Sequence, residues 1–176
     1  MGKRSNFDRI PRNFYPTPAE AVRPLLPHLP ADFSFVEPCA GAGDLVRHLD
    51  SDDRRCVWQF DIEPQADDVD RFDAFDMRLF KWGPPDLIIT NPPWERSVLH
   101  PMIDHFSAQR PTWLLFDADW MHTRQAAPFM PWLHKVVSVG RVRWITGSKM
   151  TGKDNCAWYH FDQRREGPTV LVGRVA

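Results

Sequence analysis

The tetrapeptide Asn91-Pro92-Pro93-Trp94 combines residue types that can hold a planar ligand bearing an amino group. It follows the apolar run 86–90, which has the length and composition of a buried strand. Each proline fixes its own φ and holds the residue before it extended, so the oxygens of Asn91 and Pro92 can be aimed at one point. Trp94 adds an aromatic face beside that point. The tetrapeptide is therefore typical of a site for a group such as adenine.

Two further turns of unusual composition follow earlier predicted strands. Glu37-Pro38-Cys39-Ala40-Gly41-Ala42-Gly43 places small residues between a strand and a helix, where glycine lets a ligand approach the backbone. The turn lacks the GK[ST] ending of a phosphate loop, and Glu37 favours a cationic group over a phosphate. A plain tight turn is the alternative interpretation.

Acidic residues follow the next two strands. Asp61 lies roughly 20 residues past the glycine turn, where a carboxylate can accept both hydroxyls of a ribose. Glu63 is the alternative, and Ile62 can pack on a base. Asp76 can accept an amino proton of an adenine, and Met77 can supply the adjacent backbone N–H. A solvated acid at the end of a strand is the alternative for each.

The elements that must position these turns alternate between strand and helix. Strands are predicted at 33–36, 56–60, 69–72, 86–90, 112–116, 136–145 (as one or two), 155–161 and 169–172. A helix over 18–28 is predicted to begin with Thr17 as its N-cap and Pro18 as its first residue. Further helices are predicted at 44–49 and 97–109, and 119–134 is predicted to mix helix and loop, broken at Pro128 and Pro131.

This alternation predicts a mostly parallel α/β sheet of about seven strands, with an antiparallel edge and helices on both faces. Ligands of such sheets bind at the carboxyl ends of the strands, and each unusual turn falls at such an end. Residues 1–14 are predicted to be a basic, flexible segment, and 15–176 a single domain. The 176 residues suit one domain.

Composition excludes several classes of protein. The formal net charge of −1 gives no global basic field for nucleic acid, so any such binding must use local patches. The three cysteines and seven histidines show no ligand spacing, so no metal site is predicted. We expect no membrane span and no signal peptide, and a cytoplasmic location.

Taken in order, Tyr15-Pro16-Thr17-Pro18, the glycine turn, Asp61-Ile62-Glu63-Pro64, Asp76 and Asn91-Pro92-Pro93-Trp94 resemble the motifs of a known family. The family is the S-adenosyl-L-methionine-dependent DNA adenine-N6 methyltransferases. The motif order resembles that of the members in which the cofactor motifs precede the catalytic motif. More loosely, segments 147–149 and 152–155 resemble the C-terminal part of its small phage-type members. The resemblance implies a Rossmann-like class I methyltransferase fold.

The resemblance also implies a role for each matched residue. Tyr15, Thr17 and Pro18 should hold the methionine carboxylate of the cofactor. Glu37, Ala40 and Gly41 should line its methionine portion, and Gly43 and Asn91 should also contact the cofactor. Asp61 should bind the ribose, and Ile62, Asp76 and Met77 should meet the adenine. Asn91 and the Pro92 carbonyl, held by Pro93, should accept hydrogen bonds from the target amine, and Trp94 should stack on the target base.

The implied partner is DNA, either single-stranded or a duplex with a flipped adenine. The loop around Lys149 and Lys153 can grip phosphate, with a plain surface turn as the alternative. We expect no separate target-recognition domain within these residues. The oligomeric state stays open as monomer or homodimer, and restriction-modification is one biological setting. The rivals are an RNA base methyltransferase, a protein glutamine-N5 methyltransferase and a non-enzymatic binding module.

Overall fold

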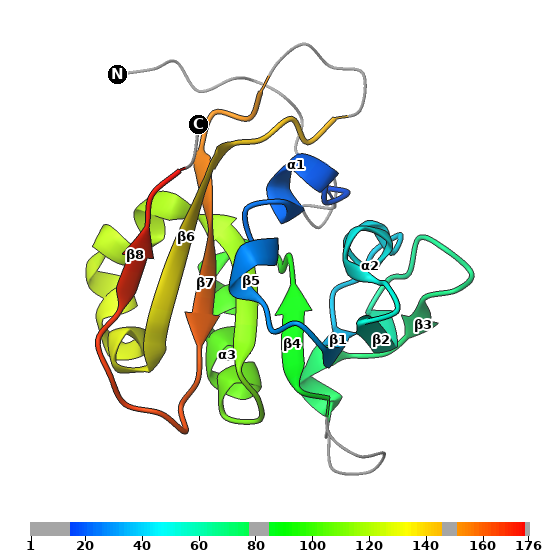
Figure 1. Ribbon diagram of the computed structural model, residues 1–176, viewed down its shortest axis with the longest axis horizontal. Helices are drawn as coiled ribbons and strands as arrows, with labels where there is room; N and C mark the ends of the chain where they lie inside the picture. The colour runs from blue at the N-terminus through cyan, green and yellow to red at the C-terminus, as the bar shows by residue number, and fades with distance from the viewer. Residues whose placement is uncertain (1–14, 78–84, 146–150, 175–176) are drawn as a thin grey trace.

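Eight strands form one mixed sheet in the computed structural model of the protein, which describes residues 15–77, 85–145 and 151–174 (Figure 1). The strands are β1 (Phe33–Glu37), β2 (Arg54–Asp61), β3 (Asp70–Arg71), β4 (Leu87–Thr90), β5 (Thr112–Asp117), β6 (Leu133–Arg141), β7 (Asn155–Phe161) and β8 (Val170–Val172). The helices are α1 (Ala19–Val22), α2 (Asp44–Leu49), α3 (Arg96–Ser107) and the 3₁₀ segments η2 (Leu26–His28), η3 (Ala74–Asp76), η5 (Ala118–His122) and η6 (Arg124–Trp132).

The strand order is β3-β2-β1-β4-β5-β7-β6-β8. Pairing is parallel throughout except at β7, which runs antiparallel to both β5 and β6. The predicted α/β class, with a mostly parallel sheet and antiparallel pairing toward one edge, is confirmed. The structure adds that the antiparallel strand is β7 and that β8 extends the sheet by pairing parallel to β6.

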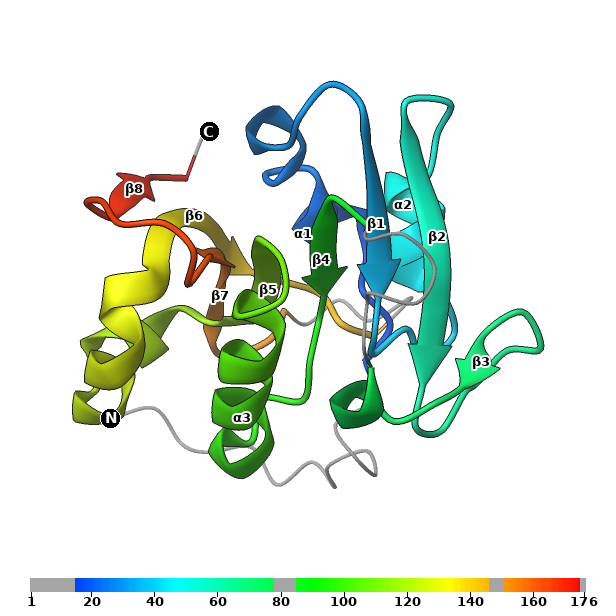
Figure 2. The same ribbon diagram turned by 90° about the horizontal axis from the view of Figure 1, so that it is seen from below.

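Helices cover both faces of the sheet, as predicted (Figure 2). On one face α3 packs Leu99, Ile103 and Phe106 against Ile88 and Phe116. On the other face, buried residues of α1 and α2 pack on apolar side chains of β1, β4 and β5. All four residues of β4 are buried, which is the pattern of a strand covered on both sides.

The first predicted helix is much shorter than 18–28. It comprises only Ala19–Val22, its N-cap is Pro18 rather than Thr17, and no side chain caps it. Pro24 and Pro27 lack the N–H that a continuing helix needs, so the chain changes to the 3₁₀ segment η2. The Thr17 side chain is therefore left available for a contact elsewhere.

The region 119–145 also differs in detail from the prediction. Prolines at 128 and 131 lie within the 3₁₀ segment η6 instead of ending it. One strand, β6, then begins at Leu133 and ends at Arg141, so Val142–Ile145 lies outside the sheet. None of the described helices is both long and apolar enough to cross a membrane.

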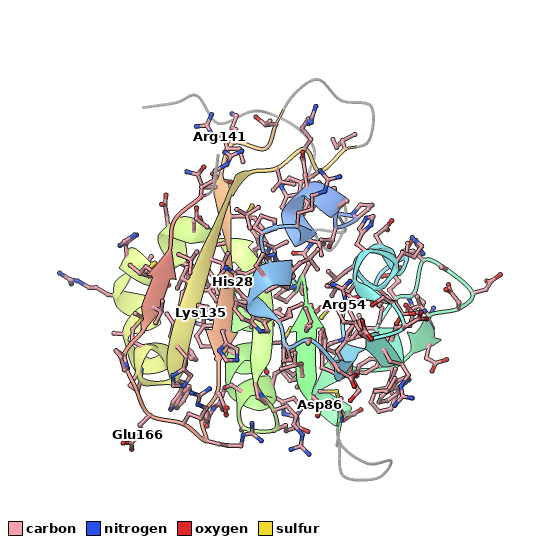
Figure 3. The ribbon with its side chains drawn as sticks, in the orientation of Figure 1. His28, Arg54, Asp86, Lys135, Arg141 and Glu166 are labelled. Carbon is pink, nitrogen blue, oxygen red and sulfur yellow. The ribbon has the colours of Figure 1, made fainter. Side chains whose placement is uncertain are left out.

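The strand order creates one crevice of the kind that binds ligands. The chain passes from β1 to β2 in one direction across the sheet and from β4 to β5 in the other, so β1 and β4 flank a topological switch point. Asp86, before β4, and Arg141, at the carboxyl end of β6, lie at opposite ends of the molecule (Figure 3). Glu37 ends β1 and Asn91 follows β4, so both lie at the carboxyl side of the crevice.

Candidate active site

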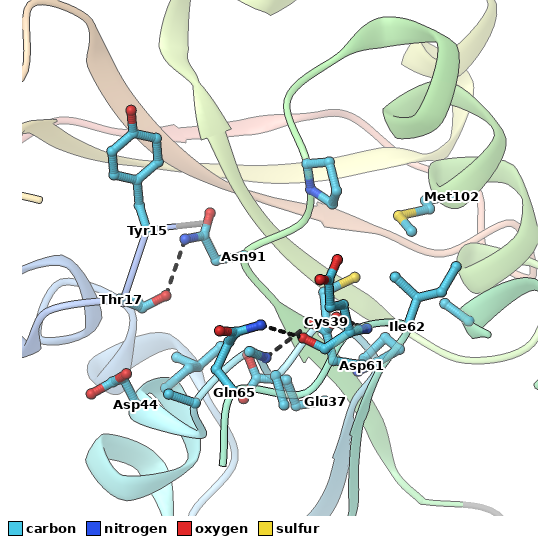
Figure 4. A pocket seen from close by; sticks show the side chains of 18 of the residues that line it. Tyr15, Thr17, Glu37, Cys39, Asp44, Asp61, Ile62, Gln65, Asn91 and Met102 are labelled. Carbon is cyan, nitrogen blue, oxygen red and sulfur yellow. Dashed lines mark hydrogen bonds between the residues drawn. The ribbon is translucent and has the colours of Figure 1, made fainter. Parts of the chain in front are cut away.

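A pocket of about 570 Å³ opens at this switch point (Figure 4). Its walls come from the segment before α1, the glycine turn after β1, the turn after β2, η3, the turn after β4 and the first turns of α3. Predicted site residues among its lining are Tyr15, Thr17, Glu37, Ala40, Gly41, Asp61, Ile62, Asn91 and Pro93. Motifs as far apart in sequence as Tyr15 and Asn91 thus meet around one cavity.

A second pocket, of about 320 Å³, adjoins the first. It is lined by Tyr15, Asn91, Pro92, Trp94, Glu95, Trp144, Gly152, Lys153 and Asp154. Three of these residues, Tyr15, Asn91 and Glu95, line both pockets. The Asn91 side chain therefore stands where the two cavities meet.

Both ends of the Asn91 amide are hydrogen-bonded. Its Nδ2 donates to the Thr17 hydroxyl at 3.1 Å, as Figure 4 shows, and its Oδ1 accepts from the Trp94 indole Nε1 at 3.3 Å. The same indole N–H also donates to the Leu115 carbonyl of β5 at 3.1 Å. A carbonyl oxygen has two lone pairs, so Asn91 Oδ1 keeps one for a ligand.

Aromatic rings from three segments surround the second pocket. Trp144 meets Trp94 edge to face, with ring centroids 5.8 Å apart, and lies 6.3 Å from the Tyr15 ring. Gly152 lets the backbone pass close to Trp144, because a Cβ there would lie 3.1 Å from the indole. These rings give the pocket the apolar walls that a flat base needs.

Glu37 carries the most unusual charge in the larger pocket. Its side chain is only 1% exposed, and Oε2 has no hydrogen-bond partner among the residues that the structure describes. Burial, reinforced by the nearby Asp61 carboxylate, raises the pKa of the Glu37 carboxyl well above its ordinary value. A cationic donor entering the pocket would supply both the missing hydrogen bond and the missing countercharge.

Asp61 fixes the geometry of the glycine turn as well as lining the pocket. Its Oδ2 accepts from the Gly41 backbone N–H at 2.9 Å, and its Oδ1 accepts from the Glu63 N–H at 2.8 Å. Gly43 does not line the pocket; it adopts φ +80° as the N-cap of α2. Pro18 likewise lies outside the lining and acts at the start of α1.

Near η3 the pocket is lined by a different acid from the one that the motif singles out. Asp76 is exposed and Met77 is fully buried in the core, and neither lines the pocket. Asp73, Ala74 and Phe75 line it instead, because η3 begins after Asp73, which accepts from the Phe75 N–H. Ile62 is 52% exposed at the rim, as an apolar contact for a ring requires.

Cys39 also lines the pocket, in an environment that favours the neutral thiol. Burial raises the pKa of its thiol, and Asp61 raises it further, so the thiolate is disfavoured.

Several lining residues carried no sequence signal. Trp144, Asp73 and Phe75 lie in segments without a motif, and Gln65 and Met102 reach the pocket only through the fold. Of the two lysines predicted to contact phosphate, Lys153 lines the second pocket, whereas Lys149 lies outside the described residues, as does the basic segment 1–14.

Comparison with solved structures identifies the fold. A chain from a type I R-M system superimposes with a TM-score of 0.61 at 15% identity, over 96% of this chain and 46% of that one. A modification subunit of a putative type I restriction enzyme from Vibrio vulnificus superimposes with a TM-score of 0.55 at 13% identity, over 93% of this chain and 47% of that one. The 23S rRNA methyltransferase ErmE superimposes with a TM-score of 0.56 at 15% identity, over 88% of this chain and 71% of that one.

No protein-family model matches the sequence, and no curated protein does either. The protein has the Rossmann-like fold that class I methyltransferases share, and a putative class I S-adenosylmethionine-dependent methyltransferase from Listeria monocytogenes superimposes with a TM-score of 0.53 at 10% identity, over 90% of this chain and 63% of that one. The chain spans slightly less than half the length of the two type I chains that it resembles.

Proposed function

We propose that the protein transfers a methyl group from S-adenosyl-L-methionine to the N6 amine of adenine in DNA. The observation that carries this proposal is the pair of adjoining pockets with Asn91 between them. One pocket is fitted for a nucleoside bearing a cation, and the other is walled by aromatic rings. A group held at Asn91 can therefore reach the contents of both.

The residues of the larger pocket fit the cofactor. The unpartnered Glu37 Oε2 suits the amino group of the methionine portion, and Asp61 lies where it can accept ribose hydroxyls. Ile62 and Phe75 provide apolar contacts for the adenine ring, and we assign Asp73, in place of Asp76, to its amino group. When bound, the cofactor supplies an electrophilic methyl group on a sulfonium.

Asn91 and Pro92 act on the target amine. The N6 lone pair of adenine is delocalised into the ring, which makes the amine a poor nucleophile. Hydrogen bonds from the amine to Asn91 Oδ1 and to the Pro92 carbonyl would pull the nitrogen toward sp³ geometry and stabilise the positive charge that develops on it. With the cofactor bound, the N–CH₃ bond would form as the C–S bond breaks, the electron pair would stay on sulfur, and one N6 proton would then pass to solvent.

The second pocket holds the target base in this proposal. Trp94 and Trp144 present ring surfaces, and the exposed Lys153 can meet a phosphate beside the base. Entry of an adenine from a duplex requires flipping, which costs a few kcal/mol of unstacking. Similar folds in type I modification subunits support DNA as the acceptor.

An RNA base is the second candidate acceptor. It is favoured by the similarity to a 23S rRNA methyltransferase and to a dimethyladenosine transferase from Plasmodium falciparum. The pocket residues described above would contact the base and not the sugar, so they suit either polymer.

Labelled cofactor incubated separately with duplex DNA, single-stranded DNA, RNA and protein extract distinguishes these acceptors. We expect label in DNA, recovered as N6-methyladenine after digestion to nucleosides. Label only in RNA would favour the second candidate. Label only in protein, or none despite cofactor binding, would rule out the proposal.

Asn91→Ala tests the role of the Asn91 amide in methyl transfer. Removing the amide should lower transfer by roughly a hundredfold or more, as loss of a transition-state hydrogen-bond acceptor does, while cofactor affinity stays within a few-fold. The exposed Asn155→Ala, outside both pockets, should leave the rate unchanged. Substantial turnover by Asn91→Ala would refute the assigned role.

A further inference from the structure

We propose that the Trp94 indole N–H and the Thr17 hydroxyl are positioning groups that select one of the two orientations of the Asn91 amide. The inference rests on the proposed function and assigns Thr17 and Trp94 roles beyond cofactor binding and base stacking. Its basis is a chain of hydrogen bonds from β5 through Trp94 and Asn91 to Thr17.

An asparagine amide can rotate by 180° about its last side-chain bond, which exchanges its acceptor and donor ends. The single hydrogen of an indole N–H can only be donated, and here Leu115 O at 3.1 Å and Asn91 Oδ1 at 3.3 Å share it, so the amide atom that faces Trp94 Nε1 is the oxygen. A hydroxyl can donate or accept, so Thr17 can pair with either end of the amide. Trp94 therefore determines the orientation, and Thr17 completes it by accepting from Nδ2.

Rotation of the amide would place Nδ2 against the indole N–H, as two donors facing one another. It would also turn a donor toward the space where the amine of the target must find an acceptor. A phenylalanine at position 94 would keep an aromatic wall but would not distinguish the two orientations. The indole nitrogen is thus the feature of Trp94 that matters for Asn91.

Both positioning groups are anchored to the sheet. The indole N–H donates to Leu115 O in the middle of β5, and the ring packs partly buried against both apolar cores. Thr17 is 5% exposed, and the segment that carries it is tied to β7 by the buried Trp158 indole, which donates to Ala21 O at 2.8 Å. Anchoring at both ends restrains the amide that lies between them.

Steady-state kinetics of substituted proteins test this proposal. Trp94→Phe should lower kcat about tenfold, the typical effect of one lost hydrogen bond, while KM for DNA changes less than about threefold. Trp94→Ala, which also removes the ring, should in addition raise KM. The control Trp132→Phe changes another half-buried tryptophan, which lines neither pocket, and should alter neither constant.

Thr17 gives the complementary comparison. Thr17→Val keeps the shape but removes the acceptor for Nδ2 and should lower kcat severalfold, whereas Thr17→Ser should restore it. A role in folding alone would lower the melting temperature of the valine variant without this recovery of kcat. An unchanged kcat in both Trp94→Phe and Thr17→Val would overturn the proposal.

Proton NMR supplies a readout that is independent of turnover. The indole signal that disappears in Trp94→Phe should exchange slowly with solvent, and the Nδ2 protons of Asn91, assigned from Asn91→Asp, should shift in Thr17→Val. Fast exchange of the Trp94 proton would contradict the hydrogen-bond chain. If no acceptor is methylated but these signals behave as expected, the proposed function fails and the positioning of the amide stands.

Discussion

At the scale of single residues, Glu37 is a buried carboxyl whose charged form the fold disfavours. The folded protein holds the proton of this buried carboxyl more tightly than the unfolded chain does, because its pKa is raised. As the pH rises above 4.5, the ordinary pKa of a glutamate, this carboxyl ionises in the unfolded chain while it stays protonated in the folded protein. Ionisation lowers the free energy of the unfolded chain relative to that of the folded protein. The free energy of unfolding therefore falls as the pH rises, and a bound cation would reverse this loss.

Glu37→Gln should separate the effect of the Glu37 carboxyl on stability from its effect on cofactor binding. The amide removes the ionisable group, so the free protein should be more stable than the wild type at pH 8. Its affinity for S-adenosylhomocysteine should fall roughly ten- to a hundredfold, because a hydrogen bond between charged partners is lost. Urea unfolding and calorimetric titration measure the two quantities, and equal affinity of both proteins would show that no cation binds at Glu37.

Asp73 and Asp76 form a matched pair of acids on either side of Phe75. Only Asp73 lines the pocket, so Asp73→Ala should weaken S-adenosylhomocysteine binding by about tenfold, the effect of one hydrogen bond. Asp76→Ala should leave the affinity unchanged, because that side chain is exposed outside the pocket. The reverse result would restore the assignment that the sequence motif implied.

At the scale of elements, the glycine turn shows how one backbone conformation shapes the site. Gly43 adopts φ +80° where α2 begins, and a Cβ there would lie 3.1 Å from Gln59 Oε1. The turn is held from the other side by Asp61, which accepts from the Gly41 N–H. The positions of the turn and of β2 are therefore coupled.

Gly43→Ala should lower the free energy of unfolding by about 1–2 kcal/mol, the cost of a left-handed conformation for a residue with a Cβ. Gly173→Ala, where a Cβ would meet nothing within 4 Å, should change it by less than about 0.5 kcal/mol. Urea denaturation of both variants checks this difference. Equal stabilities would mean that the turn relaxes without strain.

At the scale of the whole molecule, His160 links the stability of the sheet to pH. It lies on β7, stacked on Trp113 of β5 with ring centroids 4.7 Å apart. Burial, with a contribution from His134, lowers its pKa from 6.5 to about 4. Between these values the unfolded chain binds a proton that the folded protein does not, so stability falls as the pH drops below 6.5.

His160→Phe should remove this dependence while keeping an aromatic ring against Trp113. Between pH 7.5 and 4.5 the wild type should lose up to about 3 kcal/mol through this group, and the variant correspondingly less. Urea unfolding at the two pH values measures the difference between the proteins. Identical losses would assign the pH dependence to other groups.

Local sequence determined most of the elements. Short apolar runs between prolines, glycines and acids located β1, β4, β5 and β7, because such runs bury their side chains in a strand and such residues end it. Local chemistry also identified the turns that meet at the carboxyl edge. The limits of α1 were wrong, since the prolines at 24 and 27 prevent the helix from continuing.

Contacts between distant segments were decided by the tertiary structure alone. Thr17 and Asn91 are 74 residues apart, yet their side chains are hydrogen-bonded. Trp144 follows the end of β6 and lines the second pocket beside Trp94, and Asp73, which precedes η3, lines the larger pocket whereas Asp76 does not. The sequence alone determined which residue types and turns were available for chemistry. Which of them face one another depends on packing that joins remote segments, and no local pattern encodes that packing.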